Sequence, residues 1–548
     1  MNHTLKPTAI FFNAIPPDFE QLKSNHPESL TLMGSLVFSY GLLCALLRYC
    51  TAERIFLPNA VRPPYGDIRD TQLFKDNLSR ITFVSAHNLS ELQLAGPLTF
   101  VSPMPDLLSL SHLRNISNLT QAPVTGFIHS INSSAQLREM VLLHLSGLND
   151  FDALVCSSTA GHSALCKFME LASEMLQLQG IHERQNNVAT PVIPIGIDTD
   201  RFSPPRTLID GGGTPFSKTN FLYIGRISSA SKADLIPLLL MFRDSFGCAT
   251  DAHITIAGDD ALQQARGLKE CVQFLSLGEM VSIVPDPTQE KKHELLASSD
   301  IFLAPSDNIQ ETFGITLIEA MAAGLPVIAS DWNGYKDIII NGETGFLVPT
   351  TLPLYGARFD ALRGSGRTAE SDMLSATTMV NYGEFASKMK LLSENLQLRL
   401  TMGSAARRRA RQVYDWKAIV PKYESLWGEL RTLAACCPRH HVIDFESFHY
   451  LKPFSHYSTN VFSMNTPIEL ARNVTCDGLR LELLDLFGIG FVAHLFDEII
   501  NLVNRDGPIR AGDLIERVSR TANVEETVLQ MHVYRLMKYG VLTYSRVI

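Results

Sequence analysis

The sequence predicts an α/β protein with two parallel-sheet domains and a smaller module at its C-terminal end. Its 548 residues exceed what one hydrophobic core usually accommodates. Short apolar runs alternate with polar and helix-favouring segments, as is typical of α/β domains. Two prolines at 204–205 and three glycines at 211–213 indicate a linker. We therefore expect domains at 1–204 and 218–430, a linker at 205–217 and an accessory module at 431–548.

Composition and charge narrow the class of protein. The chain is 45% apolar and 19% charged, like a globular protein, and its formal net charge of −9 argues against a general nucleic-acid-binding surface. Nine cysteines, an odd number, favour a reducing compartment over a disulfide framework. The N-terminus lacks a signal-peptide pattern, and the most apolar stretch, residues 35–50, is short for a membrane span. We expect a cytoplasmic location.

The most informative stretch is residues 300–349, which predicts a strand, a loop, a helix and a second strand. Residues 301–304 (I-F-L-A) form an unbroken apolar run, typical of a strand covered on both faces. A polar loop over 305–314 precedes the helix-favouring residues 315–323. Gly324 and the proline two residues later are helix-stop signals, so that residues 327–329 begin the next buried strand.

Two glutamates mark this unit, Glu311 in the loop and Glu319 in the helix. Helix rise places them roughly 10 Å apart, too far to hold one functional group. They could hold the two ends of an elongated ligand whose middle lies over the helix start, where free N–H groups and the helix dipole favour phosphate. A nucleotide sugar has this form. In isolation, two glutamates with this spacing are more often solvated or capping residues, and only the surrounding pattern favours a binding role.

That surrounding pattern, F-G after Glu311 and E-A-M-A-A-G-L-P-V-I-A-S around Glu319, resembles the signature region of GT4-type retaining glycosyltransferases of the GT-B fold. A second, distant stretch, P-V-I-P-I-G-I-D-T-D-R-F-S-P at 191–204, resembles the exit from the N-terminal domain of these enzymes. The resemblance covers about residues 8–430. It implies two Rossmann-like domains facing across a cleft, with the nucleotide sugar on the second domain and the acceptor mainly on the first.

Two cations follow the predicted first strand of the second domain. Arg226 comes directly after Gly225, and Lys232 lies six residues further on. Arginine binds phosphate with a bidentate fork and lysine as a compact charge, so the pair could neutralise a diphosphate leaving group. In isolation such residues more often lie in a solvated loop. Their position ahead of the two glutamates favours the diphosphate role.

The resemblance implies roles for the remaining candidate residues. Glu311 would bind the donor sugar and Glu319 the ribose, while His129, at the end of a predicted strand, would bridge donor and acceptor. On this interpretation Glu311, His129, Arg226 and Lys232 carry the chemistry. The donor-binding set adds Gly225, Phe313, Gly314, Ile315, Thr316 and Glu319, and the acceptor side begins with Gly34 and Ser35, which precede a helix expected over 34–49. Cations and a helix terminus replace a metal, so no metal and no cofactor are expected.

The module at 431–548 predicts three helices, over 491–504, 511–520 and 524–539, followed by a strand, as in a winged-helix-like fold. Between Asp497 and Arg546, seven basic residues balance seven acidic ones, which favours docking of a protein or peptide, or dimerisation, over DNA binding. The arrangement also resembles small peptide-recognition domains of the PqqD type. The arginine cluster at 407–411 predicts a solvated helix face.

The leading prediction is a nucleotide-sugar-dependent hexosyltransferase with an unidentified acceptor. Two alternatives stay open: a sugar phosphorylase or synthase of the same fold, and a non-catalytic sugar-nucleotide-binding or scaffold protein that acts through its C-terminal module. A metal site at C-C-x-x-H-H, residues 436–441, is disfavoured because the spacing departs from that of tetrahedral zinc sites.

Overall fold

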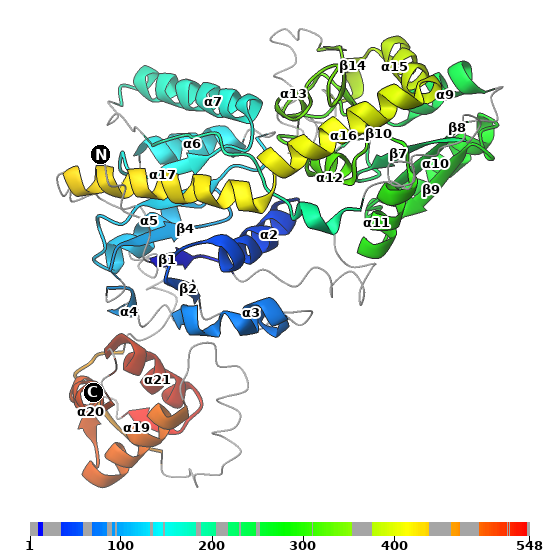
Figure 1. Ribbon diagram of the computed structural model, residues 1–548. Coiled ribbons are helices and arrows are strands. Elements are labelled where there is room, and N and C mark those ends of the chain that lie inside the picture. The colour runs from blue at the N-terminus through cyan, green and yellow to red at the C-terminus, as the bar shows by residue number, and fades with distance from the viewer. Residues whose placement is uncertain are drawn as a thin grey trace.

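Two six-stranded parallel sheets organise the molecule, each covered by helices on both faces (Figure 1). The computed structural model describes residues 9–14, 34–58, 68–84, 90–93, 96–131, 135–145, 148–181, 188–203, 218–229, 232–247, 252–309, 311–352, 375–437, 462–471, 493–522, 524 and 526–544. The expected linker at 205–217 lies outside these ranges.

The first sheet has the strand order β3-β2-β1-β4-β5-β6, with every pairing parallel. Its strands are β1 (Ala9–Phe12), β2 (Arg54–Pro58), β3 (Ile81–Val84), β4 (Leu98–Val101), β5 (Val124–Phe127) and β6 (Ala153–Val155). Helices α2 (Gly34–Tyr49), α3 (Gln72–Asp76) and α17 (Trp416–Cys436) pack on one face, and α4 (Ser90–Gln93), α5 (Leu107–Ile116), α6 (Ala135–Leu145) and α7 (Thr159–Leu178) on the other. The predicted bounds of α2 are confirmed.

The second sheet repeats this topology as β12-β11-β10-β7-β8-β9. Its strands are β7 (Thr219–Ile224), β8 (Ala252–Gly258), β9 (Val281–Pro285), β10 (Ile301–Ala304), β11 (Val327–Ser330) and β12 (Gly345–Val348). Helices α9 (Ile236–Phe246), α10 (Ala265–Phe274) and α15 (Tyr382–Glu394) cover one face, and α11 (Gln289–Ser298), α12 (Ile315–Ala323), α13 (Tyr335–Ile338) and α16 (Leu396–Val413) the other. Outside this sheet, β13 (Thr350–Thr351) pairs antiparallel with β14 (Met379–Val380).

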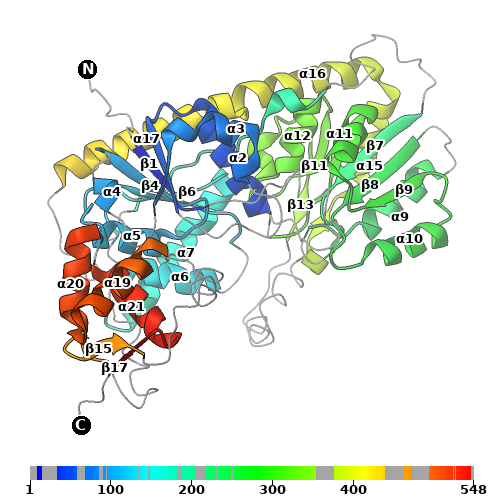
Figure 2. The ribbon, with the colours of Figure 1, turned by 90° about the horizontal axis from the view of Figure 1, so that it is seen from below.

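Two parallel-sheet domains facing each other are the GT-B arrangement that the sequence predicts. The chain crosses between them twice, and the crossings touch, since the N–H of Ile197 donates to the carbonyl of Tyr414 (2.8 Å) and that of Trp416 to Ile197 (3.0 Å). Beside the crossings, the Trp416 indole packs so closely that a Cβ on Gly196 would lie 2.5 Å from it. Helices α16 and α17 then run along both domains (Figure 2).

The two domains also touch beside the loop that follows β10. The hydroxyl of Ser158 donates to the carbonyl of Thr312 (2.6 Å), and the hydroxyl of Thr312 donates to the carbonyl of His129. The carboxylate of Asp337 accepts hydrogen bonds from both the N–H and the hydroxyl of Thr159 (2.6 Å each). The start of α7 is therefore held against the second domain.

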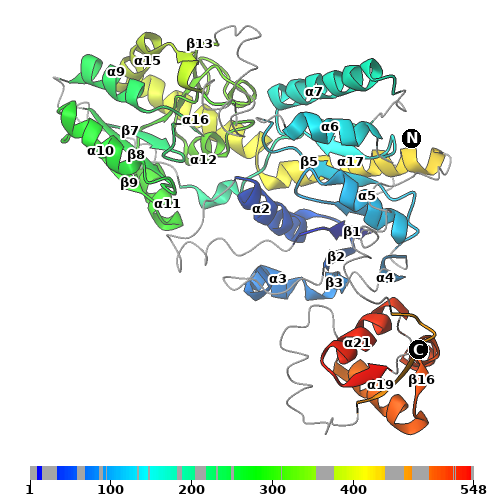
Figure 3. The same cartoon turned by 180° about the vertical axis from the view of Figure 1, so that it is seen from behind.

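In its described residues, the C-terminal module contains the three predicted helices, α19 (Ala493–Asp506), α20 (Ala511–Ala522) and α21 (Glu526–Lys538). Its strand β17 (Leu542–Tyr544) is joined by two further strands, β15 (Pro467–Leu470) and β16 (Ile509–Arg510), in an antiparallel sheet. The module has its own apolar core and lies on the side of the first domain (Figure 3).

The prediction of a solvated arginine cluster at 407–411 is wrong for two of its members. Arg407 donates to the carbonyl of Phe202 (2.9 Å), and Arg409 donates to those of Asp337 (2.8 Å) and Ile338 (2.9 Å). Their side chains satisfy backbone carbonyls at the ends of other segments, which a charge pattern along one helix cannot reveal.

Candidate active site

The candidate site lies where the second sheet reverses its strand order. Strands β7 and β10 are neighbours, but the chain continues from β7 to β8 on one side and from β10 to β11 on the other. The loops after such strands diverge and leave a crevice, where ligands bind in open α/β sheets. Arg226 follows β7 and Glu311 follows β10, so both predicted residues are at this switch point.

Lys232 and Glu311 form an ion pair across the crevice, although 79 residues separate them in the chain. Both side chains are largely buried, with exposed fractions of 15% and 14%. Burial acts to raise the pKa of Glu311, but the Lys232 ammonium, the N–H of Phe313 and the Arg226 charge outweigh it and leave the pKa lowered. Glu311 is therefore an ionised acceptor between two cations.

Close backbone contact fixes the base of the crevice. A Cβ on Gly258 would lie 1.6 Å from the carbonyl oxygen of Gly225, and a Cβ on Gly225 would lie 2.7 Å from the Tyr223 phenol oxygen. The hydroxyl of Ser306 donates to the carbonyl of Lys232 (3.1 Å). These contacts leave room only for glycine and tie the loop of Lys232 to the loop of Glu311.

Helix α12 begins at the crevice as predicted. Gly314 is its N-cap with φ of 119°, a left-handed conformation that glycine adopts without strain, and Gly324 ends the helix in the same region. The first N–H groups of a helix have no intrahelical acceptor, which leaves those at Ile315 and Thr316 to face a ligand. The N–H of Phe313 donates to Glu311 Oε1 (3.3 Å), and its predicted contact with phosphate stays a prediction.

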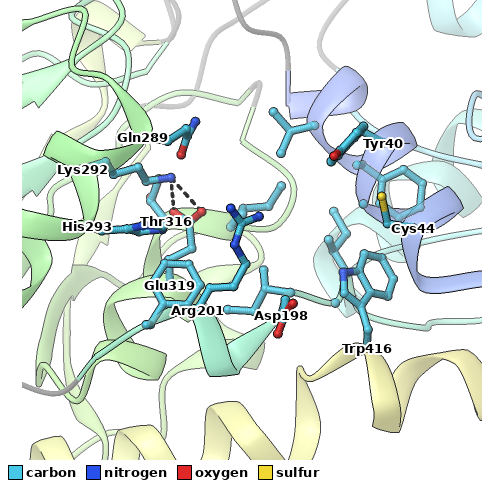
Figure 4. A pocket seen from close by; sticks show the side chains of 18 of the residues that line it. Tyr40, Cys44, Asp198, Arg201, Gln289, Lys292, His293, Thr316, Glu319 and Trp416 are labelled. Carbon is cyan, nitrogen blue, oxygen red and sulfur yellow. Dashed lines mark hydrogen bonds and ion pairs between the residues drawn. The ribbon is translucent and has the colours of Figure 1, made fainter. Parts of the chain in front are cut away.

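Glu319 has a partner that the sequence prediction missed. Lys292 Nζ lies 2.7 Å from Glu319 Oε1 and 2.6 Å from Oε2, and both side chains are largely buried (Figure 4). Lys292 is on α11, which starts at Gln289 with Thr288 as N-cap. Treating Thr288 as a helix-start signal would have placed Lys292 on this helix.

A cavity of about 670 Å³ lies between the Lys292–Glu319 pair and the first domain, and Lys232, Glu311, Phe313 and Gly314 are not among the residues that line it. Its wall on the second domain includes four of the predicted donor-binding residues, Gly225, Ile315, Thr316 and Glu319, and the predicted catalytic residue Arg226. The opposite wall is mostly apolar and comes from α2 and the domain crossings, with Tyr40, Cys44 and Trp416 turned toward it (Figure 4). Arg48 and Asp198 form an ion pair (2.8 Å) in this wall.

His129 lies beside the loop of Glu311 rather than in this cavity wall. Its backbone carbonyl accepts the Thr312 hydroxyl, and its ring packs edge-on against Phe38 at 5.2 Å. Nε2 lies 2.6 Å from the carbonyl of Pro103; because a carbonyl can only accept, Nε2 carries the proton and Nδ1 keeps a lone pair. Burial lowers the pKa of His129, so the ring is neutral near pH 7.

The predicted acceptor-side residues Gly34 and Ser35 are the first two residues of α2. Their side chains lie outside the described part of the structure, and their role stays a prediction. Within the described ranges, no group of three or more His, Cys, Asp or Glu residues is placed to hold a metal ion. Of the C-C-x-x-H-H stretch, His440 and His441 lie outside those ranges.

The sequence of the second domain matches a known family. Residues 213–353 match the family described as "Glycosyl transferases group 1". The matched segment contains β7 to β12, and with them Arg226, Lys232, Glu311 and Glu319.

Two proteins that match part of the chain are named as glycosyltransferases. The chain is 32% identical over 161 residues to a phosphatidyl-myo-inositol mannosyltransferase of Mycobacterium leprae, which covers 29% of this chain and 39% of that protein. It is 28% identical over 227 residues to a D-inositol 3-phosphate glycosyltransferase of Thermomonospora curvata, covering 39% of this chain and 51% of that protein. The matches thus span about half or less of these relatives.

Among solved structures, Anabaena Alr3699/HepE in complex with UDP aligns over 78% of this chain and 100% of its own, with a TM-score of 0.49 and 17% identity. A glycosyltransferase from Rickettsia africae ESF-5 aligns over 78% and 99%, with a TM-score of 0.49 and 16% identity.

No described helix is both long and apolar enough to cross a membrane.

Proposed function

We propose that the protein is a retaining glycosyltransferase that moves a sugar from a nucleoside diphosphate sugar to an acceptor held mainly by the first domain. The observation that carries this proposal is the buried Lys232–Glu311 pair beside Arg226, at the switch point of a domain with a group 1 glycosyltransferase sequence. The pair combines a cation for the leaving group with an ionised acceptor for the sugar.

The diphosphate would lie between the cations and the start of α12. Arg226 and Lys232 would neutralise the charge that develops on the leaving oxygen as the glycosidic bond breaks, and donors that are already in place need no reorganisation at that moment. The N–H groups of Gly314, Ile315 and Thr316 would bind the phosphate oxygens at the positive end of the helix dipole. These residues would carry the leaving-group charge that a divalent metal carries elsewhere.

The two glutamates would address opposite ends of the donor. Glu311 is ionised and accepts hydrogen bonds only, so it would bind hydroxyls of the donor sugar. Glu319, fixed by Lys292 in the cavity wall, would accept from the ribose hydroxyls. A cavity of about 670 Å³ is within the range of small-molecule sites, roughly 300–1,000 Å³, and has room for a nucleotide.

His129 would bridge the two substrates. It lies on the first domain at its contact with the Glu311 loop, and its neutral ring offers a lone pair at Nδ1. In this position it would accept a hydrogen bond from a hydroxyl of the donor sugar or the acceptor. Arg226, Lys232, Glu311 and His129 would thus surround the bond that breaks.

A panel of nucleotide sugars tests the proposal. Donor hydrolysis and transfer are measured with UDP-, GDP- and ADP-linked hexoses; the relatives' names suggest mannose donors and inositol-type acceptors as first candidates. We expect turnover with at least one donor, a loss of about 100-fold or more in Lys232→Ala and Glu311→Gln, and normal activity in the matched control Lys291→Ala, whose lysine is half-exposed on α11.

Product analysis tests the stereochemistry and the alternatives. NMR of the product should show that the anomeric configuration of the donor is retained. Tight binding of a nucleotide sugar without turnover for any acceptor, including cell extract, would overturn the enzyme assignment. Consumption of free phosphate in place of a nucleotide sugar would identify a phosphorylase.

A further inference from the structure

Asp307, which no part of the proposed reaction uses, joins three segments behind the Lys232–Glu311 pair. It lies in the loop after β10 and is 4% exposed. Its Oδ2 accepts the N–H of Asp234 (3.3 Å), and its Oδ1 lies 3.2 Å from Oγ of the buried Ser375. The same Oγ lies 3.0 Å from the carbonyl oxygen of Ser229. Two residues that flank Lys232 are therefore connected to one carboxyl group, Asp234 directly and Ser229 through Ser375.

The protons available for the hydrogen bonds that link Asp307, Ser375 and Ser229 can be counted. A serine hydroxyl has one proton, and the Ser229 carbonyl can only accept. If Ser375 gives its proton to Ser229, the shorter of its two contacts, then the contact with Asp307 needs a proton from the carboxyl group. An ionised Asp307 would leave one of the two contacts without a hydrogen. A protonated Asp307 satisfies both contacts, and its Oδ2 still accepts from Asp234.

The surroundings also disfavour a charge at this position. The groups that face Asp307 are the Asp234 carboxylate ahead of α9, the buried Tyr223 phenol of β7 and the Tyr382 phenol of α15. Burial raises the pKa of Asp307 to about 7, with a further contribution from Asp234, against the hydrogen bonds from Asp234 N–H and Ser375. Burying an unpaired carboxylate is costly, and protonation removes that cost.

We propose that Asp307 is a positioning residue that acts as a neutral carboxylic acid, donating to Ser375, which donates to Ser229. These hydrogen bonds hold Ser229 and Asp234, which flank Lys232, against the loop after β10, so that the ion pair is in place before the donor binds. The inference rests on the proposed function for its effect on turnover. The protonation state of Asp307 and the hydrogen-bonded chain can be tested without any substrate.

Substitution by asparagine distinguishes the neutral acid from the carboxylate. In Asp307→Asn, the amide NH₂ donates to Ser375 and the amide oxygen accepts from Asp234, as the protonated acid does. We expect this variant to keep kcat/KM within about threefold of the wild type and to lose less activity at alkaline pH. Ser375→Ala removes the hydrogen bonds between Asp307 and Ser229 and should raise the KM for the nucleotide sugar by about tenfold or more, with a smaller effect on kcat.

Two measurements on the full-length protein are independent of activity. The folded pKa of Asp307 is above the value of about 3.9 in an unfolded chain, so its contribution to stability is complete below that value and is lost as pH rises toward about 7. The Tm of the wild type should fall over this range relative to Asp307→Asn. An infrared band of a protonated carboxyl group should be present at pH 6 and absent in the variant.

The proposal is wrong if Asp307→Asn lowers kcat/KM as much as Ser375→Ala does, or if the Tm of the two forms varies with pH in parallel and the infrared band is missing. These last two results would show an ionised Asp307 even if no donor were turned over. Conversely, the infrared band and a pH-dependent Tm without turnover would contradict the proposed function but still support a neutral Asp307.

Discussion

Lys292 shows how the role of one residue depends on a partner far away in sequence. Glu319 is buried on α12, and its carboxylate is paired with Lys292 of α11. A buried charge that loses its partner is strongly destabilised, so the lysine is needed to hold the Glu319 carboxylate in place. The pair lies in the cavity wall, where it faces the cavity (Figure 4).

Replacing Lys292 should therefore weaken nucleotide binding. In Lys292→Met, Glu319 loses its partner, and we expect the Kd for the preferred nucleoside diphosphate to rise about tenfold or more, equivalent to about 1.4 kcal/mol. Isothermal titration with UDP, GDP and ADP measures it. The matched variant Lys291→Met, one position away on the same helix, should bind normally. Equal affinity in both variants would remove Glu319 and Lys292 from the site.

A second buried pair should matter for stability. Arg114 and Asp152 are both fully buried and 2.6 Å apart, and Asp152 also accepts the N–H groups of Val124 and Asn149. Asp152→Ala leaves an unpaired arginine in the core of the first domain, and we expect a loss of about 3–5 kcal/mol in unfolding free energy. Chemical denaturation measures the loss.

The control for this prediction is Glu270→Ala, which breaks the exposed pair of Arg266 and Glu270. This variant should unfold like the wild type, since exposed pairs contribute little. If Asp152→Ala also unfolds like the wild type, the buried pair contributes no net stability.

At the residue scale, the sequence indicated candidate site residues but not the partners that hold them. Arg226, Lys232, Glu311 and Glu319 lie in motifs that surround a switch point, so chain order alone brings them together. Lys292 and Asp307 are within the same domain, but their partners are 27 and 68 residues away. Only the packing of α11 on α12, and of residue 375 on the loop after β10, creates these contacts.

At the scale of elements, the start of α12 requires glycine at position 314. Gly314 has φ of 119°, and a Cβ there would lie 2.6 Å from the ring of Tyr335. Gly314→Ala should displace α13 or the Glu311 loop, with a loss of about 1–3 kcal/mol from backbone strain and a loss of nucleotide binding. Thermal unfolding and titration measure these effects.

Gly267 provides the control within another helix. It lies inside α10, its φ is not positive, and a Cβ added there would meet no atom within 4 Å beyond the backbone of its own helix. Gly267→Ala should raise stability by about 0.5–1 kcal/mol because alanine favours the helix. A loss in both variants would show that the Gly314 effect is not specific to its conformation.

Elements were predictable where local signals and burial agreed. The bounds of α2, β10 and α12 follow from long apolar runs with clear stop signals. Helices α15 and α16 are separate because Asn395 ends α15 and caps α16 through its side chain (2.9 Å to the N–H of Leu398). Strand β15 was missed since its four residues become a strand only by pairing with β16 and β17.

For the whole molecule, the relative position of the domains should depend on Asp337. Its carboxylate accepts both the N–H and the hydroxyl of Thr159 at the start of α7. Asp337→Ala removes these contacts, and we expect a larger radius of gyration in small-angle X-ray scattering, with the Tm of each domain unchanged. Asp331→Ala, which removes a longer surface contact of 3.8 Å to Lys336, is the control and should scatter like the wild type.

The architecture was predictable because each domain repeats one strand order, which chain connectivity favours for parallel sheets. The contacts between the domains were not, since Ser158, Thr159, Thr312 and Asp337 belong to no sequence motif. Ser158 caps α7 by accepting the N–H of Gly161 (3.0 Å), a local role typical of serine at a helix start. Its second contact, across the domain boundary, depends on the assembled molecule.

The paired crossings at Ile197 and Tyr414 make the second domain an insertion whose two ends meet. Its entry and exit are joined by two backbone hydrogen bonds, and the indole of Trp416 covers the junction. A segment with adjoining ends can be exchanged without stretching the chain on either side. The donor-binding half of this protein could accordingly be grafted as a cassette onto another acceptor half, with the cut sites at the residues that pair.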